Sequence, residues 1–126
     1  MPVVEAGAGS SEELGSSLNV RVVQDSARLE IHVTNVASSP IVLEFMTTQR
    51  YDFEVSSPDG DPVWRWSADK AFGEALGAES LEPGESRRYE TTWSGGGRSG
   101  DFVATARIVS ANFPVELRTV FRLPAE

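Results

Sequence analysis

Apolar and polar residues alternate along much of the chain, and a period of two is typical of strands that bury one face. In the stretch "ARLEIHVTN", Leu29, Ile31 and Val33 alternate with polar or charged neighbours. The same alternation appears in "LNVRVVQ", "IVLEF", "RYDFEV", "VWRWS", "RRYETTW", "DFVATARIVS" and "VELRTVFRL". The sequence therefore predicts about eight short strands.

The stretch "RYDFEV" shows what this alternation implies for single side chains. On a strand, Tyr51, Phe53 and Val55 point inward, while Asp52 and Glu54 point to solvent. We therefore expect an apolar inner face and a charged outer face on this strand.

Turn sequences separate the strands, and one stretch has a different period. "SSPDGDP" and "LEPGES" are turn signals, and "SGGGRSG" is a loop with almost no stiffness. In "SADKAFGEALG", Phe72, Ala75 and Leu76 are spaced for one side of a short helix. Ser67 is the expected N-cap of this helix and Gly77 its expected end.

Many short strands with frequent turns, and no alternation of strands with helices, indicate an all-β fold. We predict an antiparallel β-sandwich of immunoglobulin-like type with one short helix covering its open end. Residues 1–16 are mostly Gly, Ala, Ser and Glu and are expected to form a flexible tail. The sandwich domain is then expected over residues 17–126.

The composition narrows the classes of partner and compartment. The 126 residues carry a formal net charge of −8, so nucleic acid and anionic membrane surfaces are unfavourable partners. No apolar run is long enough to cross a bilayer, and no signal peptide is recognisable. The chain has no cysteine, which fits the cytoplasm; export or tethering to the cell envelope is the alternative if a leader has been removed.

Residues for catalysis or metal binding are scarce. The single histidine, His32, lies beside Glu30 on the polar face of its strand and has no partners for a general base or a metal site. The pairs Asp52/Glu54 and Glu79/Glu82 lie on sequence predicted to be exposed. Asp59 and Asp61 could contribute to a calcium site, but Asp-Gly-Asp-Pro is also ordinary turn sequence. We therefore predict no enzyme activity, no cofactor and no metal.

Two tryptophans invite two interpretations. Trp64 and Trp66 are two residues apart, so on a strand they share a face, while Arg65 points to the other. A buried face makes them core residues, and an exposed face makes them a stacking platform for a sugar or a protein. We expect them in the core, and Arg65 in solvent or paired with an acid.

The region 49–86, with "RYDF", the Asp-Gly turn, "VWRWS" and "LEPGES", resembles the BsuPI-type intracellular proteinase inhibitors of bacteria. "VTNVASSPIVLEF" before it and "SGDFVATA" after it extend the resemblance over most of residues 19–123. Phe102 stands where the family pattern usually has a tyrosine, so a hydroxyl group is missing there. The resemblance implies an immunoglobulin-like sandwich that inhibits an intracellular subtilisin-like serine protease.

The partner is therefore expected to be a protein, and three loops are candidates for its contact: residues 56–62, 78–85 and 94–100. The segment 67–81 is a further candidate. The residues expected at the contact are Pro58, Asp59, Gly60, Asp61, Phe72, Arg98 and Ser99. Two other interpretations stay open: a non-inhibitory interaction module of a larger assembly or the cell envelope, and a carbohydrate-binding sandwich.

Overall fold

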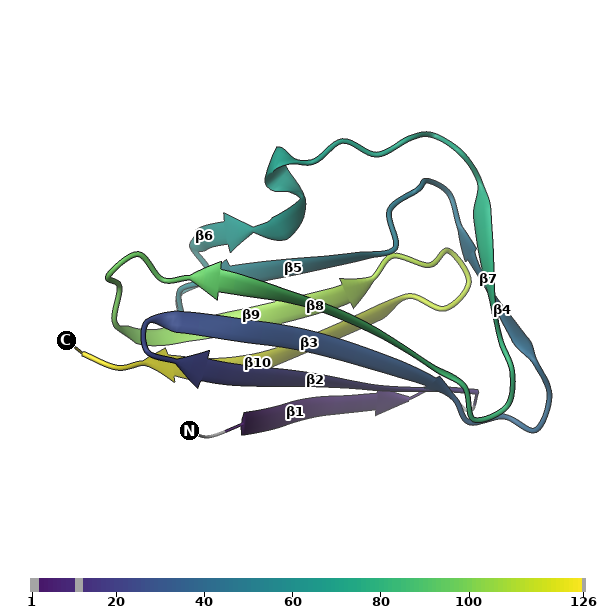
Figure 1. Ribbon diagram of the computed structural model, residues 1–126, viewed down its shortest axis with the longest axis horizontal. Helices are drawn as coiled ribbons and strands as arrows, with labels where there is room; N and C mark the ends of the chain where they lie inside the picture. The colour runs from purple at the N-terminus through teal and green to yellow at the C-terminus, as the bar shows by residue number, and fades with distance from the viewer. Residues whose placement is uncertain (1–2, 11–12, 126) are drawn as a thin grey trace.

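The structure, a computed structural model, describes residues 3–10 and 13–125. These residues form two antiparallel four-stranded sheets, which pack on each other, and a separate two-stranded sheet (Figure 1). The first sheet has the order β1 (Val3–Ser10), β2 (Leu14–Val23), β3 (Ser26–Asn35), β8 (Ser86–Ser94). The second has the order β10 (Val115–Leu123), β9 (Gly100–Ile108), β5 (Tyr51–Ser56), β6 (Pro62–Arg65). The predicted immunoglobulin-like β-sandwich is confirmed.

The core lies between the sheets and is built from alternate residues of each strand. On β3, for example, Leu29, Ile31 and Val33 are buried while Arg28 is exposed, as the period of two predicts. Burying each such side chain contributes about 1.5–3 kcal/mol to folding. The largest fully buried side chains are Phe45, Phe53, Leu18, Leu29, Ile31, Leu43, Leu81, Ile108 and Leu123.

The two-stranded sheet, β4 (Ile41–Phe45) with β7 (Gly77–Leu81), lies across one end of the sandwich (Figure 1). The side chain of Asn112 holds the other edge of β4. Its amide donates to the carbonyl oxygen of Val42 (2.9 Å) and its Oδ1 accepts from the backbone N–H of Glu44 (2.9 Å). Strand β4 is therefore bonded on both sides.

The described residues contain ten strands, two more than the sequence predicts. The additional strands are β1 and β7. Strand β7 reads "GAESL", whose small and acidic residues have low strand propensity. It forms because it pairs with β4 in full register, from Ile41 opposite Leu81 to Phe45 opposite Gly77.

The predicted short helix is much reduced. Only Trp66–Asp69 is helical, as the single 3₁₀ turn η1. The expected α-helix does not continue to Gly77, and Ser67 caps nothing with its side chain, because its hydroxyl donates to Asp52 instead. No helix of the described residues is long and apolar enough to cross a membrane.

The range 1–16, predicted as a flexible tail, falls partly on described residues. Residues 3–10 form β1, which pairs with β2, and β2 itself starts at Leu14. Residues 1, 2, 11 and 12 lie outside the described residues. A division into tail and domain at residue 16 stays a prediction.

Candidate functional site

The predicted contact residues Pro58, Asp59, Gly60 and Asp61 lie on the turn between β5 and β6, and all four are exposed. The backbone of Ser57 closes this turn. Its N–H donates to Asp61 (2.9 Å) and its carbonyl oxygen accepts from Gly60 (2.9 Å). Gly60 has φ +94°, which only glycine adopts easily. The turn is therefore compact and projects into solvent.

The predicted contact residues Arg98 and Ser99 lie in the loop between β8 and β9, here called the glycine loop (residues 95–99), and both are exposed. Hydrogen bonds hold this loop in place. The N–H of Gly95 donates to the carbonyl oxygen of Asp25 (2.8 Å), and the N–H of Arg98 donates to that of Gly95 (3.1 Å). The guanidinium of Arg98 also donates to Gly95 (3.1 Å).

These two loops lie at the same end of the sandwich (Figure 1). Strands β5 and β9 are neighbours, and Ser56, just before the turn, pairs with Val103, near the start of β9. The structure thus brings the turn and the glycine loop to one end of the molecule. Phe72 is not with them, because its ring packs against Trp66, 6.0 Å away between centroids.

Phe72 belongs to an extended segment that the sequence predicts to be helical. Residues 70–76, here called the strap, run from η1 to β7 without regular secondary structure (Figure 1). Phe72 is half-buried and the other six residues are exposed. Leu76, expected on the inner side of a helix, has 77% of its surface exposed. Gly73, a poor helix former inside the predicted helix, is the sequence signal against that helix.

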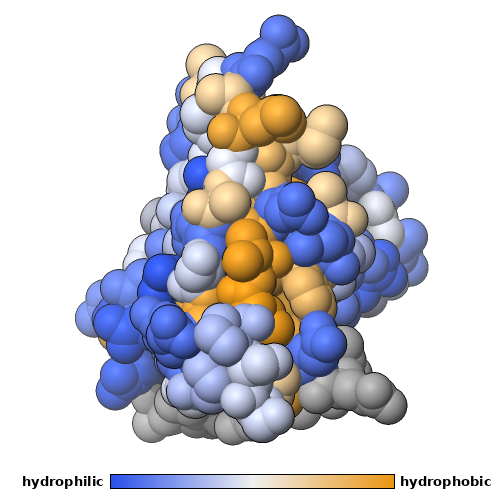
Figure 2. Space-filling model, turned by 90° about the vertical axis from the view of Figure 1, so that its right-hand side faces the viewer, coloured by the Kyte–Doolittle hydropathy of each residue, from blue (hydrophilic) through white to orange (hydrophobic). Residues whose placement is uncertain are grey.

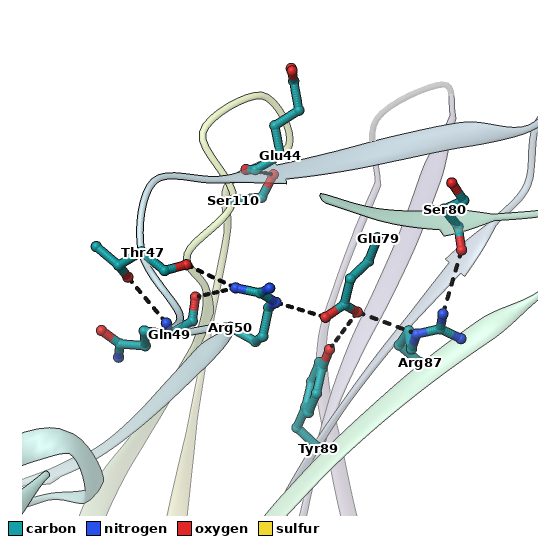
Figure 3. Close-up of polar contacts among 9 residues, drawn as sticks. All are labelled: Glu44, Thr47, Gln49, Arg50, Glu79, Ser80, Arg87, Tyr89 and Ser110. Atoms are coloured by element: carbon teal, nitrogen blue, oxygen red, sulfur yellow. Dashed lines mark hydrogen bonds and ion pairs between the residues drawn. The ribbon is translucent and has the colours of Figure 1, made fainter. Parts of the chain in front are cut away.

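An arginine holds the framework beneath the end of the strap (Figure 3). Arg50 donates to the carbonyl oxygens of Thr47 (2.8 Å) and Gln49 (3.4 Å), and its Nε donates to Glu79 Oε2 on β7 (2.7 Å). Its guanidinium carbon also lies 4.3 Å from the ring centroid of Phe45. Arg50 therefore ties the β4–β5 connection to β7.

Glu79 is the centre of this network, which sequence analysis missed because it placed the residue on an exposed loop. Its carboxylate accepts from Arg50, from Arg87 (3.4 Å) and from the hydroxyl of Tyr89 (3.3 Å) (Figure 3). Burial acts to raise the pKa of Glu79, but the hydrogen bonds from Arg50, Arg87 and Tyr89, together with the charge of Arg50, outweigh it, so the pKa is lowered. Burial, with the nearby Glu79 charge, raises the pKa of Tyr89 to about 12.

A buried carboxylate joins two of the sequence motifs. Asp52, expected to face solvent, is only 4% exposed. It accepts from Arg65 Nε (3.1 Å), the backbone N–H of Ser67 (3.2 Å), the hydroxyl of Ser67 (2.7 Å) and the N–H of Phe53 (2.9 Å). The expected pairing of Arg65 with an acid is confirmed. Asp52 thereby fixes "RYDF" to "VWRWS" and anchors the start of η1.

Trp64 and Trp66 are half-buried and pack against the core. The ring of Trp66 lies 4.4 Å from that of Tyr51, which stacks on Tyr89 at 4.5 Å. Trp64 lies opposite Val55 and so shares its inward face. Both tryptophans therefore contribute to core packing, and Trp66 does so through the ring of Tyr51.

His32 lies on the outer face of the first sheet, where its Nε2 is 2.5 Å from Glu30 Oε1. Among residues 3–10 and 13–125, no group of three or more His, Asp or Glu side chains is placed to hold a metal ion. Asp59 and Asp61 belong to no such group.

The sequence matches the model of one protein family, described as BsuPI, intracellular proteinase inhibitor, over residues 14–113. No curated protein matches it. It is similar to the structure of the β-glucosidase EmGH1 from Erythrobacter marinus, with 14% identity and a TM-score of 0.43 over 97% of this chain and 15% of that one.

Two further structures are similar. Beta-glucosidase 3B from Thermotoga neapolitana has 17% identity and a TM-score of 0.46, over 99% of this chain and 16% of that one. The GAE domain of GGA2p from Saccharomyces cerevisiae has 16% identity and a TM-score of 0.30, over 99% of this chain and 98% of that domain. The chain thus spans 15% and 16% of the two glucosidases.

Proposed function

Because the chain belongs to the BsuPI family of intracellular proteinase inhibitors, we propose that it inhibits an intracellular subtilisin-like serine protease by protein–protein binding. The family match over residues 14–113 is the observation that carries this proposal. It includes the turn 57–61, the strap and the glycine loop. The family is described by inhibition and not by a catalysed reaction, which supports a non-enzymatic role in the cytoplasm.

Two exposed loops support this proposal. A protease cleft binds extended or projecting chain, and binding is tighter when that chain is already ordered. The turn 57–61, with Pro58, Asp59, Gly60 and Asp61, projects and is closed by hydrogen bonds. Arg98 and Ser99 are exposed on a bonded loop at the same end. Both remain proposed contacts, as does Phe72.

The net charge of −8 adds a further property to the proposal. An acidic protein associates faster with a partner whose contact surface is basic, and added salt weakens that attraction. We expect association with the protease to slow as the salt concentration rises.

The test is a titration of a subtilisin-like protease with this protein, following residual protease activity and the intactness of the added chain. Stoichiometric loss of activity with the chain uncut supports the proposal. Full protease activity, or rapid cutting of the added chain, contradicts it. In that case a non-inhibitory interaction module becomes the better interpretation of the fold.

A further inference from the structure

The strap has the backbone that a protease cleft recognises. Its residues cross from η1 to β7 outside the sandwich, and six of the seven are exposed. Among the described residues, the backbone groups of Ala71, Glu74 and Ala75 have no hydrogen-bond partner. Unpaired, exposed backbone groups are available to a second strand, and main-chain pairing of this kind gives affinity in peptide recognition.

The strap is also fixed to the framework at its middle. The N–H of Gly73 donates to Thr48 Oγ1 (2.8 Å), and the N–H of Thr48 donates to the carbonyl oxygen of Gly73 (3.0 Å). One residue earlier, Phe72 packs on Trp66, over whose ring Lys70 Nζ lies at 4.7 Å. A partner that binds this segment has little disorder to remove, so less of the binding energy is lost to ordering.

The end of the strap presents an apolar side chain on a fixed base. Leu76 is the most exposed of the large hydrophobic residues in the described chain, at 77%. The next residue, Gly77, pairs with Phe45, and a Cβ there would lie 2.5 Å from Arg50 Nη2. Leu76 therefore stands immediately before a position held by β4 and by Arg50.

Other exposed apolar side chains belong to this end of the β4–β7 sheet. Strand β4 pairs with β7 as far as Phe45 opposite Gly77, and Met46, the residue that follows Phe45, is 65% exposed. Val42, on the outer face of β4, is 43% exposed. Figure 2 shows apolar side chains gathered in a stripe across this end of the molecule. Exposed apolar stripes of this kind mark interaction surfaces.

The charges beside the strap indicate the charge that a partner's surface should carry. Glu44 and Glu74 are exposed, and neither forms an ion pair with a cation among the described residues. Two unpaired carboxylates next to an apolar stripe favour a partner with an apolar pocket and a basic rim.

We propose that the strap is the segment that enters the substrate cleft of the inhibited protease, as an extended strand with Leu76 in an apolar side-chain pocket. This inference rests on the proposed function and assigns its contact to the end of the sandwich opposite the turn 57–61. Gly77, held by Phe45 and Arg50, keeps the chain after Leu76 in place, so the bound strap resists displacement.

The experiment compares Leu76→Asp, Leu76→Phe and wild type as inhibitors of the subtilisin-like protease. A buried anchor residue dominates binding, so Leu76→Asp should raise the inhibition constant by about 100-fold. Leu76→Phe, which keeps an apolar side chain, should stay within about tenfold of wild type. The matched control is Val120→Asp, because Val120 is 59% exposed on β10 and far from the strap in the sheet order.

The outcomes separate this inference from the proposed function. Inhibition by wild type and Val120→Asp, but not by Leu76→Asp, supports the strap as the contact. Equal inhibition by all variants overturns the strap while leaving the inhibitor intact, and directs attention to the turn 57–61 and the glycine loop. No inhibition by wild type overturns the proposed function, and with it the assignment of the strap.

Hydrogen exchange gives a second readout that does not depend on a substitution. In the wild-type complex, the amide of Glu74 should exchange more slowly than in the free protein. Gly73 bonds to Thr48 on the framework side, and the backbone groups of successive strand residues point to opposite sides, so the partner strand pairs with Glu74. Unchanged exchange at this amide in an inhibited complex overturns the inference.

Discussion

The two ends of the sandwich carry exposed loops that are held in different ways. The glycine loop is held mainly through its own backbone: Gly95 donates to the carbonyl oxygen of Asp25, Arg98 donates back to Gly95, and Gly97 donates to the carboxylate of Asp25. The strap is held largely by side chains, through Thr48, the Phe72–Trp66 contact and the Arg50 network beneath its end. From its glycine content, the glycine loop is expected to be the more flexible of the two. Its backbone is nevertheless closely packed, whereas the strap has unpaired backbone groups.

This difference indicates which end suits which role. A loop whose backbone groups are already bonded offers side chains to a partner, such as Arg98 and Ser99. A segment with unpaired backbone groups and an exposed Leu76 also offers strand pairing. Five substitutions, three of them with a matched control variant, probe how each end is held.

The largest effect is expected for Gly95→Ala at the glycine loop. A Cβ at this buried position would lie 2.4 Å from the carbonyl oxygen of Asp25 and 2.6 Å from Leu123 Cδ1. A backbone oxygen moves only with its turn, so the free energy of unfolding should fall by about 3 kcal/mol. Urea denaturation measures this.

The control for that substitution is Gly97→Ala in the same loop. Gly97 has φ +82° and open space around its Cβ position, so only backbone strain of about 1 kcal/mol is expected. Equal losses for the two variants would show that close packing at Gly95 is not what holds the loop.

The next effect is expected at the other end, for Arg50→Met. This change removes three hydrogen bonds, one of them to the carboxylate of Glu79, and should lower the free energy of unfolding by about 2 kcal/mol. Thermal denaturation measures it. Arg122→Met is the control, because that arginine is 73% exposed and its pair with Asp101 should contribute less than about 0.5 kcal/mol.

The acid dependence of stability tests the same network through Glu79→Gln. The folded-state pKa of Glu79 lies below its usual value of 4.5, so its charged form stabilises the fold above that pH. This contribution is lost as the pH falls through the lowered pKa. The stability difference between wild type and Glu79→Gln should thus be present at pH 7 and shrink below pH 4.5.

A stability difference between wild type and Glu79→Gln that grows as the pH falls would contradict this role of the Glu79 network.

Tyr89 tests the same network at alkaline pH, where the stability of the fold decreases as the pH rises. Its folded-state pKa of about 12 lies above the usual 10.0, so its neutral form stabilises the fold, and this contribution is lost as the pH rises from 10 to 12. The free energy of unfolding of wild type should therefore fall more between pH 10 and pH 12 than that of Tyr89→Phe, which has no hydroxyl group to titrate.

The smallest effect on stability is expected for Thr48→Val, which removes the acceptor for the N–H of Gly73 but keeps the backbone bond between the two residues. We expect a loss of about 0.5 kcal/mol. Limited proteolysis should nevertheless cut the strap faster. In Thr47→Val, the control, the lost bond is local to Gln49 and the strap should be cut at the wild-type rate.

The strands could be predicted from the sequence because burial of one face imposes a period of two. Leu29, Ile31 and Val33 follow it without exception. The prediction of a helix over the strap was wrong. It depended only on the helical spacing of Phe72, Ala75 and Leu76 in the sequence. In the structure the segment is extended, and Thr48 bonds to Gly73, whose helix propensity is lower than that of its neighbours in the strap.

The polar networks could not be predicted, because they depend on which strands become neighbours. Asp52 is in the polar register of β5, yet Arg65 and Ser67 cover it. The sequence around Glu79 indicates a loop, whereas in the structure the pairing of β7 with β4 places Glu79 beside Arg50. The family resemblance and the exposed turn at Pro58 were accessible from motifs, whereas the exposure of Leu76 was not.

The position of the chain ends has a practical consequence. Val3 pairs with Arg21 near the end of β2, and Leu123 pairs with Gly100 at the start of β9, so both ends lie on the side of the glycine loop. The strap and the apolar stripe lie at the opposite end (Figure 1, Figure 2). A label, a sensor surface or a fusion partner attached at either terminus would therefore leave Leu76 accessible, which makes the protein suited to immobilised binding assays.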